Sequence, residues 1–180
     1  MMLLAHVDDM LVGGENISEV MSFLAELRSQ FRVREMGEPT MFLGINLTVN
    51  RAENMIHLSQ TTFIDKLLLK YGEYVGDVVA TPMIVDKHAA EDQGGKTDRP
   101  YRGLVASLLY LSVNMHTRPD ISFAVSVLTR AMEDPTVGDW VRAVRVLAYL
   151  KGTREVGVPL GGGVEGVWQE QVERGGAQVL

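Results

Sequence analysis

The sequence contains no cysteine and no long hydrophobic run. Without cysteine the 180-residue chain can form neither disulfides nor thiolate zinc sites, which fits a reducing compartment. The longest apolar stretch, residues 104–115, is shorter than the about 20 residues that a bilayer-spanning helix needs. No basic and apolar leader precedes the first apolar run. We therefore expect no membrane span, and a location in the cytoplasm or nucleus.

The sequence also has no excess of positive charge. The formal net charge at pH 7 is −6, and residues 1–85 hold 6 Lys and Arg against 11 Asp and Glu. Nucleic-acid affinity comes largely from Lys and Arg side chains that neutralise phosphates. The acidic first half is therefore a poor clamp for a duplex by itself, and a polymerase built on it would need basic surface from elsewhere.

Two short apolar runs flank adjacent aspartates in residues 1–14. Each run is too short for a helix and ends in turn residues, which predicts a β-hairpin with Asp8 and Asp9 at its bend. Two carboxylates at a rigid tip repel each other unless solvent or a cation screens them, and Mg²⁺ prefers oxygen ligands. The local pattern leaves three alternatives open: a solvated turn, part of a magnesium site, or a transition-metal site that includes His6.

The spacing of apolar residues then changes twice. Residues 17–31 show helical spacing after a capping residue, Asn16, which predicts an amphipathic helix packed on a sheet. Residues 42–49 alternate, and a polar turn connects them to residues 55–58, so that a second hairpin is expected.

The next helix is expected to begin at a capping residue, Ser59, and to end near Gly72. Apart from the aliphatic parts of charged side chains, residues 86–100 offer nothing larger than alanine for burial. Burial of this segment therefore cannot compensate for the conformational entropy that it would lose on ordering. We interpret residues 86–100 as a flexible linker.

Three helices are predicted between residues 101 and 152. Thr117 with Asp120, and Thr136 with Asp139, are cap-like starts for the second and third of them. The connections are short, so the helices should form one cluster. The last helix carries a basic strip that is either a solvated face or a phosphate-contacting one. The strip consists of Arg142, Arg145, Lys151 and Arg154.

Residues 158–180 are rich in glycine and show no sustained periodicity, which predicts a disordered tail. We interpret this tail as the product of a shifted reading frame or of truncation. Taken together, the pattern predicts an α+β fold: a partial sheet of two hairpins with one helix, followed by a small helical cluster.

Seven short motifs resemble those of copia-type retrotransposon reverse transcriptases. His6-Val7-Asp8-Asp9-Met10-Leu11 is similar to the Tyr-Val-Asp-Asp-Met-Leu hairpin of that family. The other six follow in the family's order, and the resemblance covers roughly residues 1 to 157. They are Met36-Gly37-Glu38, Phe42-Leu43-Gly44-Ile45, Leu58-Ser59-Gln60, Thr81-Pro82-Met83, Thr117-Arg118-Pro119-Asp120-Ile121 and Tyr149-Leu150-Lys151-Gly152-Thr153.

The resemblance implies an RNA-directed DNA polymerase that uses Mg²⁺ and binds an RNA/DNA template–primer. Asp8 and Asp9 would be two of its three catalytic, metal-binding acids. The third acid and the fingers lie upstream of the hairpin in the family, so we expect this chain to be inactive by itself unless another chain supplies the missing portion. Glu35 and Glu38 would be the first candidates for a substitute acid.

The family's organisation implies four segments. Residues 1–85 would be a partial palm with the start of the thumb, and residues 86–100 a linker. Residues 101–157 would be the helical thumb and connection region, and residues 158–180 the tail. The hairpin that resembles the primer grip would contact the primer through Phe42, Leu43, Gly44 and Ile45.

Three positions depart from the family's pattern. His6 replaces a tyrosine, Asp139 replaces a histidine, and Ala148 replaces an arginine. These departures keep a second interpretation open, in which the chain is a non-catalytic relic or a protein-interaction module recruited to another role.

Overall fold

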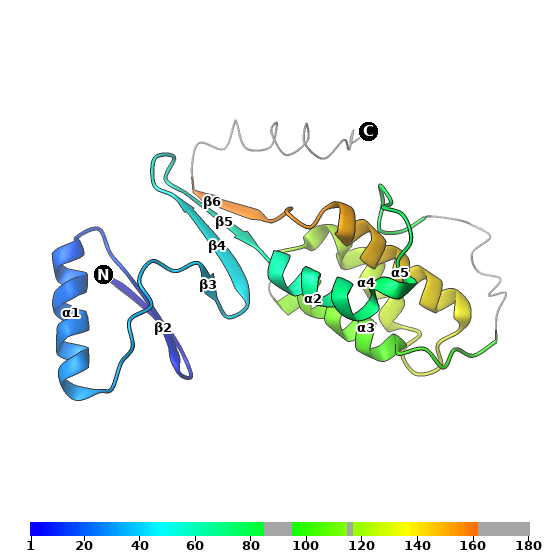
Figure 1. The fold of residues 1–180 in the computed structure, drawn as a ribbon, viewed down its shortest axis with the longest axis horizontal. Coiled ribbons are helices and arrows are strands. Elements are labelled where there is room, and N and C mark those ends of the chain that lie inside the picture. Colours follow the sequence, from blue (N-terminus) through cyan, green and yellow to red (C-terminus); the bar gives the residue numbers. More distant parts are fainter. Residues whose placement is uncertain (85–94, 115–116, 162–180) are drawn as a thin grey trace.

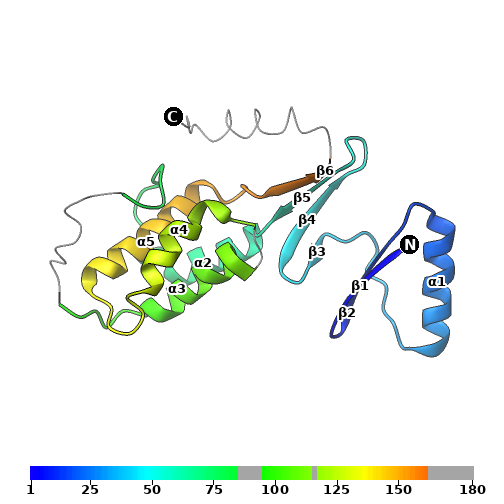
Figure 2. The same ribbon diagram turned by 180° about the vertical axis from the view of Figure 1, so that it is seen from behind.

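A computed structural model describes residues 1–84, 95–114 and 117–161. In these residues the chain forms an N-terminal hairpin with one helix, a four-stranded sheet and a helical cluster (Figure 1). Seen from behind, the hairpin and α1 lie at one end of the molecule and the helical cluster at the other (Figure 2). The predicted α+β class, with a partial sheet followed by a helical cluster, is confirmed.

The first hairpin pairs β1 (Met2–His6) with β2 (Asp9–Gly13) in an antiparallel register that runs from Met2 opposite Gly13 to His6 opposite Asp9. Helix α1 (Ile17–Gln30) follows it. The predicted capping residue Asn16 is confirmed, because its side-chain Oδ1 accepts a hydrogen bond from the Ser18 backbone at 2.9 Å. This bond satisfies one of the free donors in the first helical turn.

The second sheet has the order β3-β4-β5-β6, and every pair in it is antiparallel. Strands β4 and β5 confirm the predicted second hairpin, and β3 adds a short strand beside β4. The four strands are Met41–Phe42 (β3), Ile45–Asn50 (β4), Met55–Ser59 (β5) and Val158–Gly161 (β6).

Strand β6 departs from the expected disordered tail, because residues 158–161 pair with β5. The register places Leu58 opposite Val158 and Met55 opposite Gly161. The open edge of β5 supplies backbone partners to a segment whose own sequence shows no strand pattern. The rest of the predicted tail, residues 162–180, lies outside the described residues.

The helical cluster is formed by four α-helices and three short helical segments (Figure 1). Its three predicted helices in residues 101–152 are confirmed. The elements are α2 (Thr61–Tyr71), the 3-10 helix η1 (Gly72–Tyr74), α3 (Tyr101–Leu109), the π-helix η2 (Tyr110–Asn114), the 3-10 helix η3 (Pro119–Ile121), α4 (Ser122–Thr129) and α5 (Val137–Gly152).

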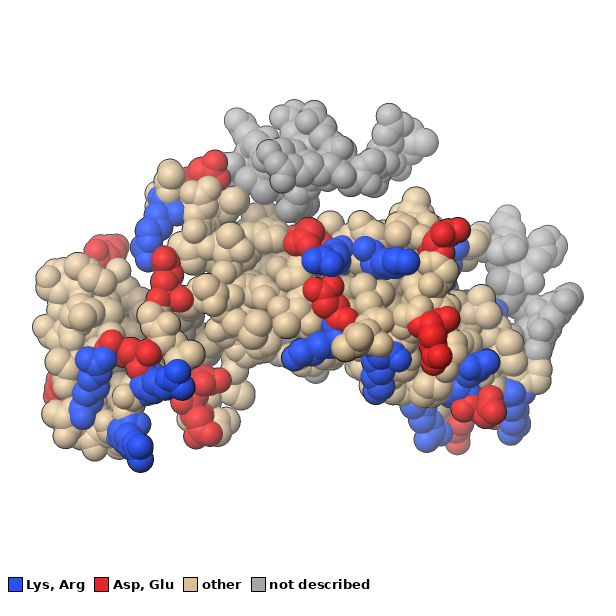
Figure 3. Space-filling model, viewed as in Figure 1, with Lys and Arg blue, Asp and Glu red and all other residues tan. Residues whose placement is uncertain are grey.

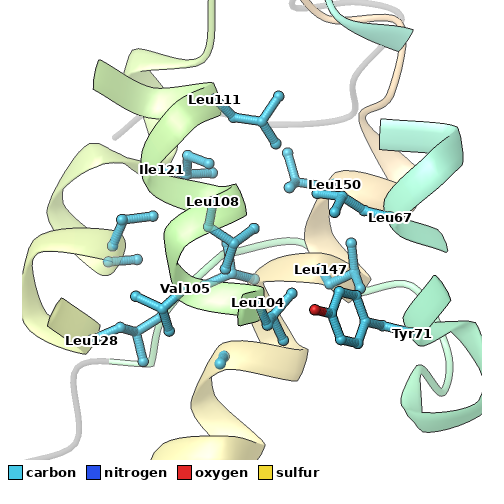
Figure 4. Close-up of a cluster of buried hydrophobic side chains, with 14 of the residues drawn as sticks. Leu67, Tyr71, Leu104, Val105, Leu108, Leu111, Ile121, Leu128, Leu147 and Leu150 are labelled. Atoms are coloured by element: carbon cyan, nitrogen blue, oxygen red, sulfur yellow. The ribbon is translucent and has the colours of Figure 1, made fainter. Parts of the chain in front are cut away.

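The hydrophobic core lies within this cluster. In Figure 4, side chains from α2, α3, α4 and α5 point toward one another, with Leu104, Leu108 and Leu147 near the centre. Each of these three leucines has 0% of its surface exposed. In residues 1–58, by contrast, Val20 is the only buried side chain. The first half of the chain therefore carries a sheet and a helix with almost no core of its own.

Two of the predicted helix caps are wrong. Helix α2 begins after Gln60 and has no side-chain cap, because Ser59 is still the last residue of β5. The helical turn η3 also lacks a side-chain cap, because the Thr117 hydroxyl is bonded elsewhere. The predicted pair Thr136 and Asp139 does form a capping box at the start of α5.

The end of the predicted linker is held by the helical cluster. Gly95 and Thr97 exchange backbone hydrogen bonds of 3.0 Å with Val137 and Pro135, and Lys96 forms an ion pair of 2.9 Å with Asp134. These contacts are between residues about 40 positions apart, and composition gives no sign of them. Residues 86–94 of the predicted linker lie outside the described residues.

Candidate functional site

The aspartate hairpin turns through Val7 and Asp8, one residue earlier than the sequence predicted. Asp9 is the first residue of β2 and lies opposite His6. Val7 has a φ of 50° and its side chain is 90% exposed. A β-branched residue in the left-handed region is a backbone outlier, and such strain, about 1–3 kcal/mol, is concentrated at functional sites. The strained turn therefore marks the hairpin tip as a candidate site.

Asp8 and Asp9 are both exposed to solvent at this tip. Carboxylate oxygens are the ligands that Mg²⁺ prefers, so the two residues fit part of a magnesium site. Within the three described stretches, no group of three or more His, Cys, Asp or Glu side chains is arranged to hold a metal ion. The predicted substitute acids Glu35 and Glu38 form ion pairs with Arg28 and Arg51 instead.

The segment that resembles the primer grip forms a tight turn between β3 and β4, where the sequence predicted a continuous strand. Phe42 lies opposite Ile45, and the two residues between them, Leu43 and Gly44, have φ values of 52° and 82°. Two left-handed residues in a two-residue loop are typical of a type I′ hairpin. Gly44 is exposed, so this turn presents its backbone to solvent.

A polar cluster around the buried Arg118 joins two of the sequence motifs. Arg118 has 0% of its surface exposed. Its guanidinium donates to both carboxylate oxygens of Asp120, at 3.0 and 2.7 Å, and to the backbone and hydroxyl oxygens of Thr153, at 2.9 and 2.7 Å. The Tyr149 hydroxyl donates to Asp120 at 2.9 Å. We call these four residues, Arg118, Asp120, Tyr149 and Thr153, the Arg118 cluster.

A third motif contacts the same region. The Thr117 hydroxyl donates to Oε1 of Gln60, and both side chains are buried. Gln60 lies between β5 and α2, so this bond ties the junction of sheet and helix to the segment that carries Arg118. The motifs by themselves indicate no contact between these residues. The available signal was an Arg and an Asp two residues apart in an otherwise apolar segment.

The charges of the Arg118 cluster shift two pKa values. Burial alone would raise the pKa of the Asp120 carboxyl, but the hydrogen bond and positive charge of Arg118 hold that pKa below its usual range. Burial, followed by the charge of Asp120, raises the pKa of Tyr149. Asp120 therefore stays ionised and Tyr149 stays protonated over the neutral range.

We expect acid to weaken the fold through Asp120. Because the folded-state pKa of Asp120 is lowered, its contribution to stability is present above the unfolded value of about 3.9 and is lost as the pH falls through the folded value. Asp120→Asn should therefore be less stable than wild type at pH 7, and the difference should shrink below about pH 4. Urea denaturation at pH 7, 5 and 3 measures this. A difference that stays constant down to pH 3 would contradict the assignment, and the exposed Asp98→Asn is the control.

The predicted basic strip is engaged within the chain: three of its residues lie on α5, and Arg154 lies beyond the end of α5 and forms ion pairs with Asp65 and Glu155. Arg142 donates to Asp139 at 2.8 Å, Arg145 donates to Thr81 at 3.1 Å, and Lys151 donates to the Gly76 carbonyl at 3.3 Å. Acidic and basic side chains also alternate over the helical cluster on the face shown in Figure 3. A phosphate-contacting role for the strip stays a prediction.

Comparison with known proteins identifies the first half of the chain. Residues 1–85 match the family model described as reverse transcriptase (RNA-dependent DNA polymerase). This range contains the aspartate hairpin, the Leu43–Gly44 turn and α2.

The matches to curated proteins extend further along the chain. It is 37% identical over 158 residues to the retrovirus-related Pol polyprotein from transposon RE2 of Arabidopsis thaliana, which covers 87% of this chain and 10% of that protein. It is 30% identical over 159 residues to the Pol polyprotein from transposon TNT 1-94 of Nicotiana tabacum, covering 84% of this chain and 12% of that protein. The chain thus spans about a tenth of the length of these polyproteins.

A shorter relative is also similar. The uncharacterized mitochondrial protein AtMg00810 of Arabidopsis thaliana is 32% identical over 154 residues, which is 85% of this chain and 62% of that protein. No solved structure matches the chain. In the part of the chain that the structure describes, no helix is long and apolar enough to cross a membrane.

Proposed function

Because this chain belongs to the reverse transcriptase family of retrotransposon Pol polyproteins, we propose that it forms part of an RNA-directed DNA polymerase. The observation that carries the proposal is the strained hairpin tip, which holds Asp8 and Asp9 in solvent within the segment that matches the family. The chain contributes these two carboxylates, the Leu43–Gly44 turn and the helical cluster.

Asp8 and Asp9 would hold Mg²⁺, and the bound ion would activate the primer hydroxyl and neutralise charge on the incoming triphosphate. Both carboxylates are exposed to solvent, which screens their charge. Without a further ligand, the two of them should attract a cation only weakly. A third carboxylate from outside this chain completes the site. By themselves, Asp8 and Asp9 are too few ligands to fix the ions or align a nucleotide.

The Leu43–Gly44 turn would contact the primer strand of an RNA/DNA template–primer. The left-handed turn exposes the backbone of Gly44 to solvent, where a sugar-phosphate strand would approach it. Phe42 and Ile45 pair across the turn and hold its two ends together. A backbone contact of this kind positions a strand without reading its bases.

The remaining polymerase portion would cover the first 58 residues. Several large apolar side chains there are more than half exposed: Met2 at 75%, Ile17 at 71%, Phe31 at 62% and Met36 at 79%. Exposed apolar surface on this scale is typical of a protein interface. The partner would be the polymerase segment that precedes the aspartate hairpin, supplied by the same polyprotein or by another chain.

Primer extension tests the proposal. On poly(rA)/oligo(dT) with Mg²⁺ or Mn²⁺, we expect no incorporation by the 180-residue chain alone, because whole ligands are absent from its site. We expect incorporation by a chimera in which residues 1–157 replace the matching segment of the RE2 Pol polyprotein. In the chimera, Asp8→Asn or Asp9→Asn should lower the rate about 100-fold or more, since even small misplacement of reacting groups costs that much.

The exposed Asp77→Asn is the matched control and should leave the rate of the chimera unchanged. Incorporation by the isolated chain that requires Asp8 and Asp9 would show that the chain completes its own site. Incorporation by the chimera that survives loss of both aspartates would refute their catalytic role.

A second candidate function rests on the same exposed apolar surface. If the chain is a relic recruited as an interaction module, the surface would bind another protein, and no catalytic step would depend on the aspartates. A chimera that folds and binds template–primer but shows no incorporation would favour this alternative.

A further inference from the structure

Tyr110 connects the helical cluster to the Leu43–Gly44 turn. It is the first residue of the π-helix η2, which continues α3, and its hydroxyl donates a hydrogen bond of 3.4 Å to the Leu43 carbonyl. The two residues are 67 positions apart. This bond therefore joins the sheet to a helix that enters the structure much later in the chain.

The tyrosine ring is itself held in place. Phe63 of α2 contacts it with ring centroids 4.9 Å apart and an interplanar angle of 49°. Tilted ring pairs at this separation are favourable. Because η2 also packs against α3, α4 and η3, the ring belongs to the folded helical cluster and presents its hydroxyl from a rigid support.

The turn is shaped to receive this hydroxyl. A Cβ atom added at Gly44 would lie 3.2 Å from the Tyr110 hydroxyl oxygen, which is closer than ordinary van der Waals contact. Gly44 also has a φ of 82°, a conformation that residues with side chains rarely adopt. Glycine at this position therefore serves both the left-handed turn and the approach of Tyr110.

We infer that Tyr110 is a positioning residue that fixes the Leu43–Gly44 turn to the helical cluster and so sets the place of a nucleic-acid strand bound at the turn. The inference rests on the proposed function for its ligand, the primer strand of a template–primer. It adds that the helical cluster sets the position of the primer strand through this side chain.

The reason is mechanical. Strand β3 has only two residues, and a turn beyond so short a strand opens easily. At 3.4 Å this O–H···O bond is longer than usual, so its loss should shift the opening equilibrium by about 2-fold, the low end of the range for a hydrogen bond. Loss of the Tyr110 hydroxyl should therefore open the turn more often and weaken strand binding by a similar factor.

Tyr110→Phe is the test variant, since it removes the hydroxyl and keeps the ring contact with Phe63. In the full 180-residue chain, hydrogen exchange of residues 41–47 should become about 2-fold faster. Affinity for poly(rA)/oligo(dT) at low salt should fall by a comparable factor, and the slowing of exchange at residues 41–47 that the duplex causes in wild type should be smaller at the same duplex concentration. Tyr74→Phe removes a hydroxyl from the same helical cluster away from the turn and should match wild type in all three measurements.

Tyr110→Leu is the second variant, and we expect it to affect the turn more strongly because the ring contact is also lost. If wild type binds the duplex and Tyr110→Phe behaves like wild type in exchange and affinity, the inference is wrong and the proposed function stands. If the wild-type chain alone does not bind the duplex, the same substitutions are compared in the RE2 chimera; if the chimera does not bind the duplex either, the proposed function fails and the inference fails with it.

Discussion

Replacing Arg118 by methionine is expected to lower the free energy of unfolding by about 1–3 kcal/mol. Arg118 is wholly buried, and its charge is matched by Asp120 at 2.7 Å and by two oxygens of Thr153. Removing the guanidinium leaves the Thr153 carbonyl and the Asp120 carboxylate without this donor, and because 30% of the Asp120 side chain is exposed, solvent compensates part of the loss. Urea denaturation followed by circular dichroism measures the loss.

Arg51→Met is the matched control for Arg118→Met. Arg51 forms an ion pair of the same kind with Glu38, but its side chain is 79% exposed. Pairs in solvent contribute little, so this substitution should change the free energy of unfolding by less than about 1 kcal/mol. Equal effects of the two substitutions would mean that the Arg118 cluster does not carry the stability assigned to it.

Substitution of Gly157 by alanine is expected to detach β6 from the sheet. A Cβ atom at this position would lie 2.1 Å from the Leu58 carbonyl oxygen and 2.9 Å from the Leu58 carbonyl carbon. These are backbone atoms of β5, so no side chain can rotate to make room. Overpacking typically costs about 1–3 kcal/mol, and here we expect residues 157–161 to move away from β5. Hydrogen exchange of residues 55–59 should rise as a result.

Gly72→Ala provides the control for Gly157→Ala. Gly72 has no neighbouring atom within 4 Å of an added Cβ, and its φ of −62° is helical. Such a substitution is expected to stabilise the fold by about 0.4–1 kcal/mol, because alanine has fewer unfolded conformations than glycine. If exchange in residues 55–59 is unchanged by Gly157→Ala, β6 does not pair with β5 in solution.

The Arg118 cluster and β6 together tie the two halves of the chain. Thr153 follows α5 and is held by Arg118, and five residues later the chain enters β6 with Val158 opposite Leu58 of β5. Gln60 follows the same end of β5 and is held by Thr117. The sheet that carries the Leu43–Gly44 turn is therefore attached to the helical cluster twice at the C-terminal end of β5, and Tyr110 adds a third contact at the turn itself. In the proposed polymerase these contacts would fix the position of the primer-binding turn relative to the helical cluster.

The periodicity of the sequence determined most elements whose cause is local, although it missed the turn at Leu43 and Gly44. Alternation predicted β4 and β5, and helical spacing with a capping box predicted α5 from Thr136 to Gly152. Adjacent carboxylates between two apolar runs predicted the first hairpin, although pairing of His6 with Asp9 moved its turn by one residue. These features depend on residues a few positions apart, so a linear pattern records them.

Tertiary structure alone decided the contacts on which the candidate sites depend. Strand β6 forms because β5 has an open edge, and Arg118 is buried because Thr153 and Tyr149 meet it from another helix. Thr117 bonds to Gln60 in preference to capping its own helix, and Tyr110 reaches a turn 67 residues away. In each case the partner is distant in sequence. A polar group that is buried without a hydrogen-bond partner costs free energy, so folding favours the arrangement in which such groups find partners, even distant ones.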